Sequence, residues 1–196
     1  MTTVSGNQYH ETLREIIFAA GKEILGIYNQ AGEIEVQSKA DESPLTMADQ
    51  LAHKVIVAGL TALDDSIPVL SEESVLPGFA KRQQWQRYWL VDPLDGTKEF
   101  IGRNGEFTVN IALIDQGKPI AGWVYIPVKA ELYYGWSGSE RAAFKEQNGE
   151  VKAIRTRPMK TDSTMYVVAS RRHGGDRLAL MLEKARRVFS SIELKN

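Results

Sequence analysis

Two carboxylates separated by a proline and a leucine form the most informative feature of this chain. Asp92 and Asp95 stand in the run WLVDPLDGTKEF, directly after the apolar residues 88–91. Those apolar residues predict a buried strand, and the acids then lie at its end, followed by the turn residues Gly96-Thr97. Hard divalent cations such as Mg²⁺ prefer oxygen ligands that converge on one point. The spacing therefore predicts a divalent-metal site where this strand ends.

A second acidic segment lies upstream of the first. The apolar residues 67–70 predict another short strand, which ends in Ser71-Glu72-Glu73-Ser74. Two neighbouring strands that both end in acids favour a metal site more strongly than either strand alone. None of the three histidines lies in these acidic segments, and the chain has no cysteine. Carboxylate oxygens without imidazole or thiolate favour Mg²⁺ over zinc.

Composition limits the classes of protein to which the chain can belong. Its 196 residues carry a formal net charge of −1, with 43% hydrophobic and 25% charged residues, which is ordinary for a globular protein. The balanced charge argues against binding of a nucleic acid polymer or an anionic membrane surface. The polar N-terminus lacks the pattern of a signal peptide, and no apolar run is long enough for a transmembrane segment. With no cysteines, we expect a cytoplasmic protein without disulfides.

Two amphipathic helices are expected in the N-terminal part of the chain. Apolar residues recur at steps of three and four over residues 9–30 and again over 48–63. A polar loop, residues 39–46, leads into the second helix, and Thr46 is its expected N-cap. Asp49 then lies in the first helical turn, where a carboxylate is electrostatically favourable.

A period of two replaces the helical period beyond residue 106, which predicts an antiparallel meander. Asp115-Gln-Gly-Lys118 is the expected hairpin turn between its first two strands. The expected strands of the first part of the chain are residues 33–38, 107–114, 119–126, 132–136, 142–144 and 151–156. Beyond them, we expect a strand at residues 164–169, a helix at 176–187 and the start of a strand at 189–194.

These elements predict an α+β fold in two lobes. Residues 1–160 are expected to form a metal-binding N-terminal lobe, with the helix pair layered on the meander sheet. Residues 161–196 are expected to be the truncated start of a C-terminal α/β lobe, because the pattern stops in the middle of an α/β unit. The apolar surface of an incomplete lobe favours self-association.

Taken together, the motifs resemble those of the lithium-sensitive, Mg²⁺-dependent phosphatases of the inositol monophosphatase superfamily. Members carry a GEES-like segment and then W-x-x-D-P-[IL]-D-G-T, which residues 71–74 and 89–97 match here. The similarity is strongest to bacterial 3′(2′),5′-bisphosphate nucleotidases of the CysQ type, through SPLTMAD, VLSEE and the run from Trp85 to Phe100. Lys98-Glu99 after Gly-Thr is typical of those nucleotidases, whereas inositol phosphatases usually have Thr-Asn. The resemblance implies a layered αβαβα fold like that of sugar phosphatases.

The resemblance also implies a set of metal ligands. They are the carboxylates of Glu72, Asp92 and Asp95 and the backbone carbonyl of Leu94. About two or three Mg²⁺ ions are implied as cofactors. Such ions lower the pKa of bound water and stabilise the leaving alkoxide, which the hydrolysis of a phosphate monoester dianion requires.

Asp49 and Thr97 match the family's pair that orients and deprotonates the attacking water. A threonine hydroxyl alone is a weak acid, but paired with a carboxylate it passes a hydrogen bond to the water and acts in general-base positioning. The resemblance implies that the substrate site is lined by Glu72, Leu94, Asp95, Gly96 and Thr97, with the amides of the last two on the phosphate.

The implied activity is hydrolysis of adenosine 3′,5′-bisphosphate, a small nucleotide, to AMP and phosphate, which removes a by-product of sulfate assimilation. Inositol monophosphatase activity is one alternative. A catalytically weak fragment is another, since family members continue to a W-D-x-A-A-like segment with a further metal ligand, and no such motif follows Ala169. Some members associate peripherally with the inner membrane, although no feature of this sequence indicates it.

Several of these residues also have purely structural interpretations. Asp-Pro-x-Asp-Gly is ordinary turn chemistry, and Asp49 is favourable in any first helical turn. Glu73 fits a solvated side chain as well as a metal ligand. Haloacid-dehalogenase phosphatases use Asp-x-Asp, but here the acids are three positions apart, so we expect no aspartyl-phosphate intermediate.

Charged and aromatic residues elsewhere leave similar alternatives. Lys39 and Asp41 fit either a third metal ion with its waters or a solvated loop. Arg171-Arg172 fits a nucleotide phosphate or, more simply, a basic surface turn. The four tryptophans, Trp85, Trp89, Trp123 and Trp136, favour packing in the core or on the sheet over a base-stacking platform.

Overall fold

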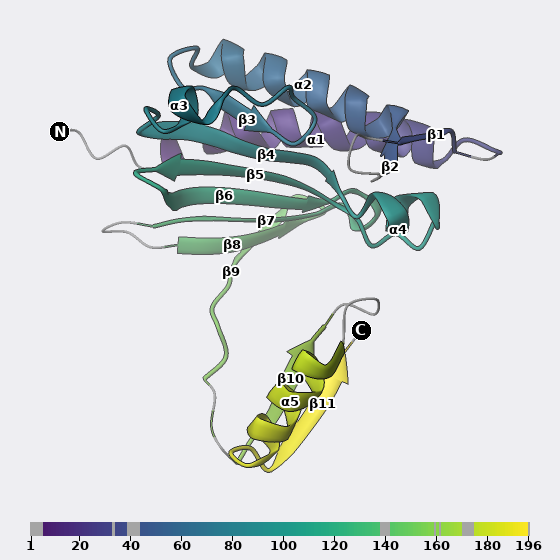
Figure 1. Cartoon of the computed structure of the whole chain (residues 1–196), viewed down its shortest axis with the longest axis vertical. Coiled ribbons are helices and arrows are strands. Elements are labelled where there is room, and N and C mark those ends of the chain that lie inside the picture. Colours follow the sequence, from purple (N-terminus) through teal and green to yellow (C-terminus); the bar gives the residue numbers. More distant parts are fainter. Residues whose placement is uncertain are drawn as a thin grey trace. The chain divides into compact units, whose positions relative to one another are not determined.

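The computed structural model describes residues 6–32, 34–38, 44–137, 142–158, 160, 162–169 and 175–195. The chain divides into two compact units, Met1–Ile154 and Arg155–Asn196. The first unit has two helices layered on one face of a sheet (Figure 1). The expected α+β class, with a helix pair on a meander sheet, is confirmed.

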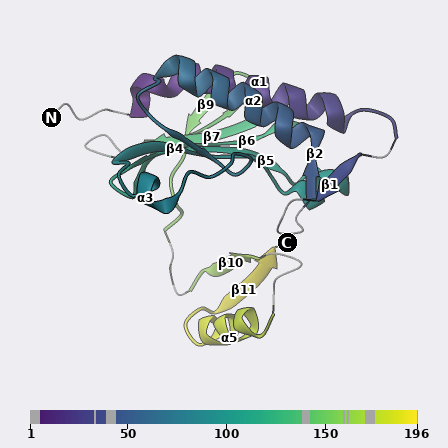
Figure 2. The same ribbon diagram turned by 45° about the horizontal axis from the view of Figure 1, so that its top comes forward.

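Both N-terminal helices form where the apolar periodicity predicts them. A short 3₁₀ turn, Gly6–Tyr9, leads into α1 (His10–Tyr28), and α2 spans Met47–Leu63. The two helices lie side by side over the same face of the sheet (Figure 2). The central residues of their apolar stripes are fully buried, so this packing fixes the position of α2 relative to the strands. The residues with no exposed surface are Leu13, Ile17, Ala20 and Ile24 on α1 and Ala48, Ala52, Ile56 and Leu60 on α2.

The sheet has seven strands in the order β3-β4-β5-β6-β7-β8-β9. β3 pairs with β4 in parallel, and every later pair is antiparallel, so the expected meander is confirmed with one parallel strand at its edge. Gln116 and Gly117 have φ angles of 50° and 73°, which suits the tight hairpin expected between β5 and β6. The strands are β3 (Val69–Ser71), β4 (Arg87–Asp95), β5 (Thr108–Asp115), β6 (Lys118–Ile126), β7 (Glu131–Trp136), β8 (Ala142–Gln147) and β9 (Glu150–Ala153).

The core lies between this sheet and the two helices. Trp89 and Trp123 have no exposed surface, and their ring centroids lie 6.3 Å apart. Trp136 packs against the same core, and the Trp85 ring lies 6.0 Å from that of Tyr88. The tryptophans thus serve packing, as expected.

Short elements complete the first unit. β1 (Val36–Ser38) and β2 (Pro44–Thr46) form a two-stranded antiparallel sheet, although residues 44–46 were expected to be loop. Three residues that begin with proline are too short for alternation to be visible. The remaining elements are α3 (Phe79–Arg82), α4 (Thr97–Ile101) and a 3₁₀ turn, Pro127–Lys129.

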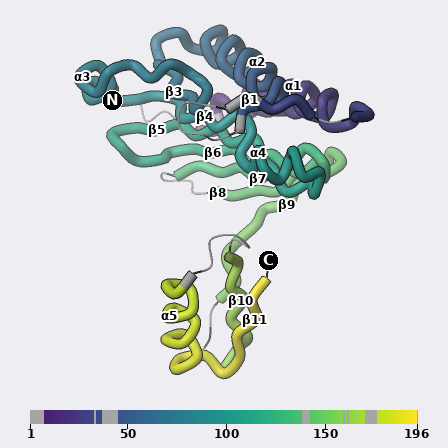
Figure 3. Tube along the Cα trace, turned by 45° about the vertical axis from the view of Figure 1, so that its right-hand side comes forward, coloured from purple at the N-terminus to yellow at the C-terminus, as the bar shows by residue number. Residues whose placement is uncertain are grey.

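The second unit contains β10 (Thr164–Val168), α5 (Gly175–Arg186) and β11 (Ser191–Lys195). The two strands pair in parallel, with α5 as their crossover (Figure 3), so the expected α/β start is present. Arg171 and Arg172 lie outside the described residues. In the described part of the chain, no helix has the length and apolar character that crossing a membrane would require.

Candidate functional site

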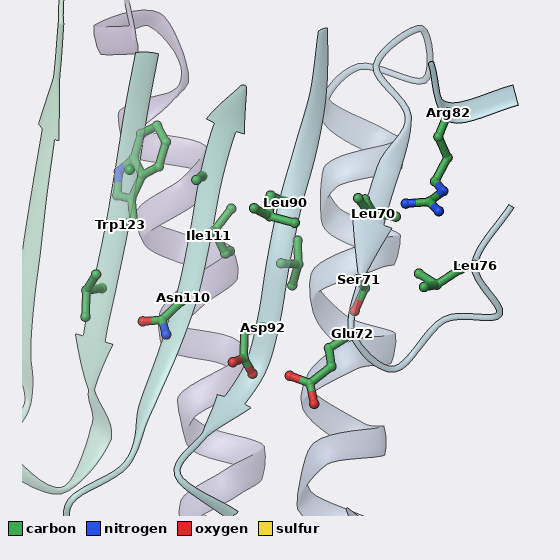
Figure 4. A pocket seen from close by; sticks show the side chains of 14 residues that line it. Leu70, Ser71, Glu72, Leu76, Arg82, Leu90, Asp92, Asn110, Ile111 and Trp123 are labelled. Carbon is green, nitrogen blue, oxygen red and sulfur yellow. The ribbon is translucent and has the colours of Figure 1, made fainter. Parts of the chain in front are cut away.

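The parallel pairing of β3 and β4 brings the two acidic segments together. Ser71 is in register with Val91, and the Glu72 amide continues the ladder by donating to the Val91 carbonyl at 3.0 Å. Because both strands run in the same direction, Glu72 and Asp92 leave the ladder at the same edge. Their carboxylates point toward one another (Figure 4). The sequence prediction of neighbouring strands that end in acids is therefore confirmed.

Asp92 has the strongest electrostatic signature of this edge. Burial raises the pKa of its carboxyl to about 7, with further contributions from the charges of Glu72 and Asp95, while a backbone hydrogen bond at Leu94 opposes the shift. A like-charged pair in a partly buried position stabilises the neutral carboxyl. A divalent cation between the two groups would reverse that balance, because it favours both ionised carboxylates.

The strand does not turn at Asp92, contrary to the expected turn. β4 continues to Asp95, with an irregularity in its pairing to β5 between these two acids. Asp95 is exposed, and the Asn110 side-chain amide donates to its Oδ2 at 3.2 Å. As in a β-bulge, this irregularity changes the directions in which the side chains of Asp92 and Asp95 project from the strand.

Gly96 makes the sharp change from β4 to α4. Its φ of 94° is in the left-handed region, and a Cβ at this position would lie 2.8 Å from the Glu106 carbonyl oxygen. Only glycine satisfies both constraints without strain. Thr97 therefore begins α4 directly beside the acids, which a bulkier residue at position 96 would prevent.

Thr97 and Asp49 meet across the site, as the resemblance implies. The Thr97 hydroxyl lies 3.3 Å from Asp49 Oδ1 and 3.3 Å from the Leu94 carbonyl oxygen. Asp49 is fully buried, and its Oδ2 accepts the Thr46 amide at 2.8 Å and the Thr46 hydroxyl as well. This capping arrangement at the start of α2 holds the carboxylate in place. The Thr97 hydroxyl oxygen keeps lone pairs with which to accept a hydrogen bond from water.

The donor set fits a hard cation, although it is not a dense metal cluster. Among the residues that the structure describes, no group of three or more His, Asp or Glu side chains is arranged to hold a metal ion. The facing pair Glu72 and Asp92, with the Leu94 carbonyl beside Thr97, supplies only oxygen. Glu73 is half-buried, and Lys39 and Asp41 lie outside the described residues.

A pocket of about 480 Å³ opens beside the acids, on the face of the sheet opposite the helices (Figure 4). Its polar lining includes Glu72, Asp92 and Asn110, with Arg82 at another part of the wall. Apolar side chains such as Leu90 line much of the rest. An apolar wall with a few polar groups is typical of small-molecule sites.

The sequence did not predict two contacts at the site. His53 Nδ1 lies 2.9 Å from Ser71 Oγ, and Asn110 joins Asp95 as described above. One signal was present for the first: His53 follows Asp49 by four residues, so both lie on one face of α2. No local pattern predicts Asn110, because its partner comes from the neighbouring strand.

Comparison with protein-family models gives one match that covers nearly the whole chain. The model described as the inositol monophosphatase family matches residues 7–191. Among curated proteins, the 3′(2′),5′-bisphosphate nucleotidase CysQ of Escherichia coli (strain K12) is 53% identical over 165 residues, which cover 84% of this chain and 64% of that protein. The CysQ protein of Haemophilus influenzae is 31% identical over 169 residues, which cover 86% and 61%.

Solved structures agree with these sequence matches. The crystal structure of CysQ from Bacteroides thetaiotaomicron superposes with a TM-score of 0.75 at 36% identity, over 94% of this chain and 70% of that one. The extragenic suppressor protein suhB from Bartonella henselae gives a TM-score of 0.72 at 26% identity, over 95% and 70%. The chain spans less than two thirds of the length of the CysQ proteins that it matches.

Proposed function

Because the chain belongs to the inositol monophosphatase family, we propose that it acts as a Mg²⁺-dependent phosphohydrolase on adenosine 3′,5′-bisphosphate. The products are AMP and phosphate, and the reaction removes a by-product of sulfate assimilation. Similarity to proteins named 3′(2′),5′-bisphosphate nucleotidase supports this choice of substrate. One structural observation carries the proposal: Glu72 and Asp92 face one another, and Thr97, which follows the end of the same strand β4, contacts Asp49.

Oxygen atoms of four residues would bind about two or three Mg²⁺ ions. They are the carboxylates of Glu72, Asp92 and Asp95 and the carbonyl of Leu94. When bound, Mg²⁺ supplies charge to neutralise the phosphate and to lower the pKa of a coordinated water. Burial, together with the charges of Glu72 and Asp95, raises the pKa of Asp92, and a bound cation would favour the ionised form of the same carboxyl.

The side chains beside the metal ligands position the water and the substrate. Thr97 accepts a hydrogen bond from the attacking water while its own hydroxyl donates to Asp49, which draws the water's proton toward that carboxylate. The water then attacks phosphorus in line with the leaving oxygen, the bond from phosphorus to that oxygen breaks, and the leaving oxygen takes a proton from solvent to become a hydroxyl of AMP. The backbone amides of Gly96 and Thr97, at the junction of β4 and α4, bind the phosphate oxygens, and Glu72, Leu94 and Asp95 line the same site.

Inositol monophosphatase activity is the second candidate, favoured by the family match itself. Lys98-Glu99 after Gly-Thr argues for the nucleotidase instead. A third outcome is a metal-binding chain with little turnover, because the relatives named as nucleotidases are longer than this chain.

Phosphate release by the purified 196-residue chain tests the proposal. We expect Mg²⁺-dependent release from adenosine 3′,5′-bisphosphate, slower release from inositol 1-phosphate, and loss of release in Asp92→Asn. Asp65→Asn is the matched control, because Asp65 is an exposed aspartate in the loop between α2 and β3. Preference for inositol phosphate would favour the second candidate. No release from a folded chain that binds Mg²⁺ would favour the third.

A further inference from the structure

A hydrogen bond between His53 and Ser71 joins the two elements that carry the acids of the proposed site. His53 Nδ1 lies 2.9 Å from Ser71 Oγ, and the contact bridges eighteen positions of sequence from α2 to β3. Ser71 is 1% exposed, and His53 is half-buried. A buried hydroxyl that is deprived of its partner is costly, so this bond constrains both elements.

On α2, His53 lies one helical turn after Asp49 and on the same face. Burial, aided by the positive charge of Lys54, lowers the pKa of His53, so its imidazole is neutral at neutral pH. A neutral ring serves in either tautomer: Nδ1 accepts from the Ser71 hydroxyl, or Nδ1–H donates to its oxygen. The contact therefore persists without any charge on the histidine.

On β3, Ser71 is the last residue of the strand and the immediate neighbour of Glu72. Its backbone is fixed on both sides, since Ser71 is in register with Val91 and the Ser74 amide donates to the Ser71 carbonyl at 3.1 Å. The side-chain bond to His53 adds a third constraint, which comes from the helix. The direction in which Glu72 leaves the strand thus depends on where α2 holds Ser71.

We propose that His53 is a positioning residue, which fixes the end of β3 through Ser71 and thereby holds Glu72 opposite Asp92. Asp49 lies one turn earlier on the same helix, so α2 sets the distance between the group that directs the water and the groups that hold the metal. The inference rests on the proposed function for its meaning in catalysis. Its structural content concerns metal binding and is measurable without turnover.

A merely structural role for this bond makes a different prediction. If the pair only satisfies two polar groups inside the fold, its loss lowers the melting temperature and leaves Mg²⁺ affinity unchanged. If it positions Glu72, its loss weakens Mg²⁺ binding, because groups that orient metal ligands typically affect metal affinity by about tenfold or more.

The test compares four single variants and the double variant Ser71→Ala/His53→Leu by calorimetric titration with Mg²⁺ alone, with thermal unfolding measured in parallel. Ser71→Ala removes only the hydroxyl oxygen, and His53→Leu removes the ring nitrogen. His53→Asn restores a hydrogen-bonding atom at the same distance along the side chain. Lys54→Leu is the matched control, because Lys54 is the exposed neighbour on the same helix.

We expect Ser71→Ala and His53→Leu each to weaken Mg²⁺ binding about tenfold. The double variant should be no weaker than either single one, since both changes break the same bond. His53→Asn should regain most of the affinity, and Lys54→Leu should bind as the unaltered chain does. Where phosphate release is measurable, the Mg²⁺ concentration for half-maximal rate should rise while KM for the nucleotide stays nearly constant.

Unchanged Mg²⁺ affinity in Ser71→Ala would overturn the proposal, as would losses that multiply in the double variant. Should His53→Leu fail to fold, Ser71→Ala and His53→Asn still decide the question. A chain that binds Mg²⁺ with the expected pattern but releases no phosphate would contradict the proposed function while leaving the positioning role supported.

Discussion

The two faces of the seven-stranded sheet differ in what they do for the molecule. On β4, Trp89 and Val91 point to the helices and are buried, while Leu90, between them, is 44% exposed on the other face. Asp92 follows on that second face, beside the pocket. The face under α1 and α2 holds most of the apolar core, and the opposite face carries Asp92 and the pocket.

This difference follows from the two-residue period of a strand. An unpaired charge on the covered face would be buried at a high energetic cost, and the buried Glu146 on that face is paired with Arg14 of α1. On the opposite face, a partly solvated carboxylate is tolerated and remains available to a cation. Substitutions on the two faces should therefore have separable effects, on stability for one and on activity for the other.

The largest effect on stability should come from Trp123→Ala. Trp123 has no exposed surface and donates through Nε1 to His10 Nδ1 at 3.3 Å, so its loss leaves a cavity and an unpaired nitrogen. We expect a loss of about 3 to 5 kcal/mol in the free energy of unfolding. The measurement is urea denaturation followed by circular dichroism.

Val124→Ala is the control for this first prediction. Val124 is the next residue on β6, is 40% exposed and lines the pocket on the opposite face. Its truncation should cost less than about 1 kcal/mol. Equal losses of unfolding free energy in the two variants would mean that both faces contribute equally to stability, which would contradict the distinction between them.

A large effect on activity without loss of stability should come from Thr97→Val. The change keeps the shape of the side chain but removes the hydroxyl that contacts Asp49. We expect phosphate release to fall about a hundredfold or more, since the water loses its link to the buried carboxylate. Thr97→Ser should retain most of the rate, and Thr61→Val, at an exposed position of α2, should change nothing. A Thr97→Val variant with full activity would exclude this pair from the reaction.

The sequence predicts the regular parts of this molecule well because their causes are local. The helical and two-residue periods locate α1, α2 and the meander, and the Thr46–Asp49 spacing predicts a capped helix start. Adjacent acids at two strand ends predict that Glu72 and Asp92 meet. That prediction needs only the parallel pairing of β3 and β4.

What the sequence does not predict depends on contacts between distant elements. The bond from His53 to Ser71 needs the packing of α2 against β3, and that from Asn110 to Asp95 needs the register of β4 with β5. The continuation of β4 through Pro93 also depends on its neighbour, because Asp-Pro-x-Asp-Gly taken alone favours a turn. The candidate metal ligands are thus readable from the sequence, whereas the contacts that orient them are not.

A smaller effect, which combines lost stability with lost activity, should come from Gly96→Ala. The substitution places a side chain at a φ of 94° and within 2.8 Å of the Glu106 carbonyl oxygen. We expect about 1 to 3 kcal/mol of lost stability, together with reduced phosphate release as Thr97 shifts. Gly117→Ala is the control, because its φ is 73° but no atom lies within 4 Å of the added Cβ. A loss in Gly96→Ala no larger than in this control would show that the close approach to Glu106 has no cost.

The smallest expected effect is the contribution of the Asp92 carboxyl to the pH dependence of stability. The pKa of Asp92 rises from 3.8 to about 7 on folding without metal, so the folded state binds its proton more tightly than the unfolded state. The stability that this proton adds is complete below pH 4 and is lost as the pH rises through 7. Because the group is partly exposed, solvent screening reduces the effect to about 1 to 2 kcal/mol.

Two histidines oppose this trend, so the prediction is a difference between two curves. Burial lowers the pKa of His10 and of His53, and each therefore adds stability as the pH rises through the range of a free histidine. Asp92→Asn keeps the histidines but removes the carboxyl, so its Mg²⁺-free stability should exceed that of the unaltered chain at pH 8 by more than at pH 4. Added Mg²⁺ should close the gap at pH 8 by stabilising only the chain that retains Asp92. Parallel curves at all pH values would mean that burial and the charge of Glu72 do not raise the pKa of Asp92 in the metal-free chain. The face that carries Asp92 would then lose its strongest indication of a cation site.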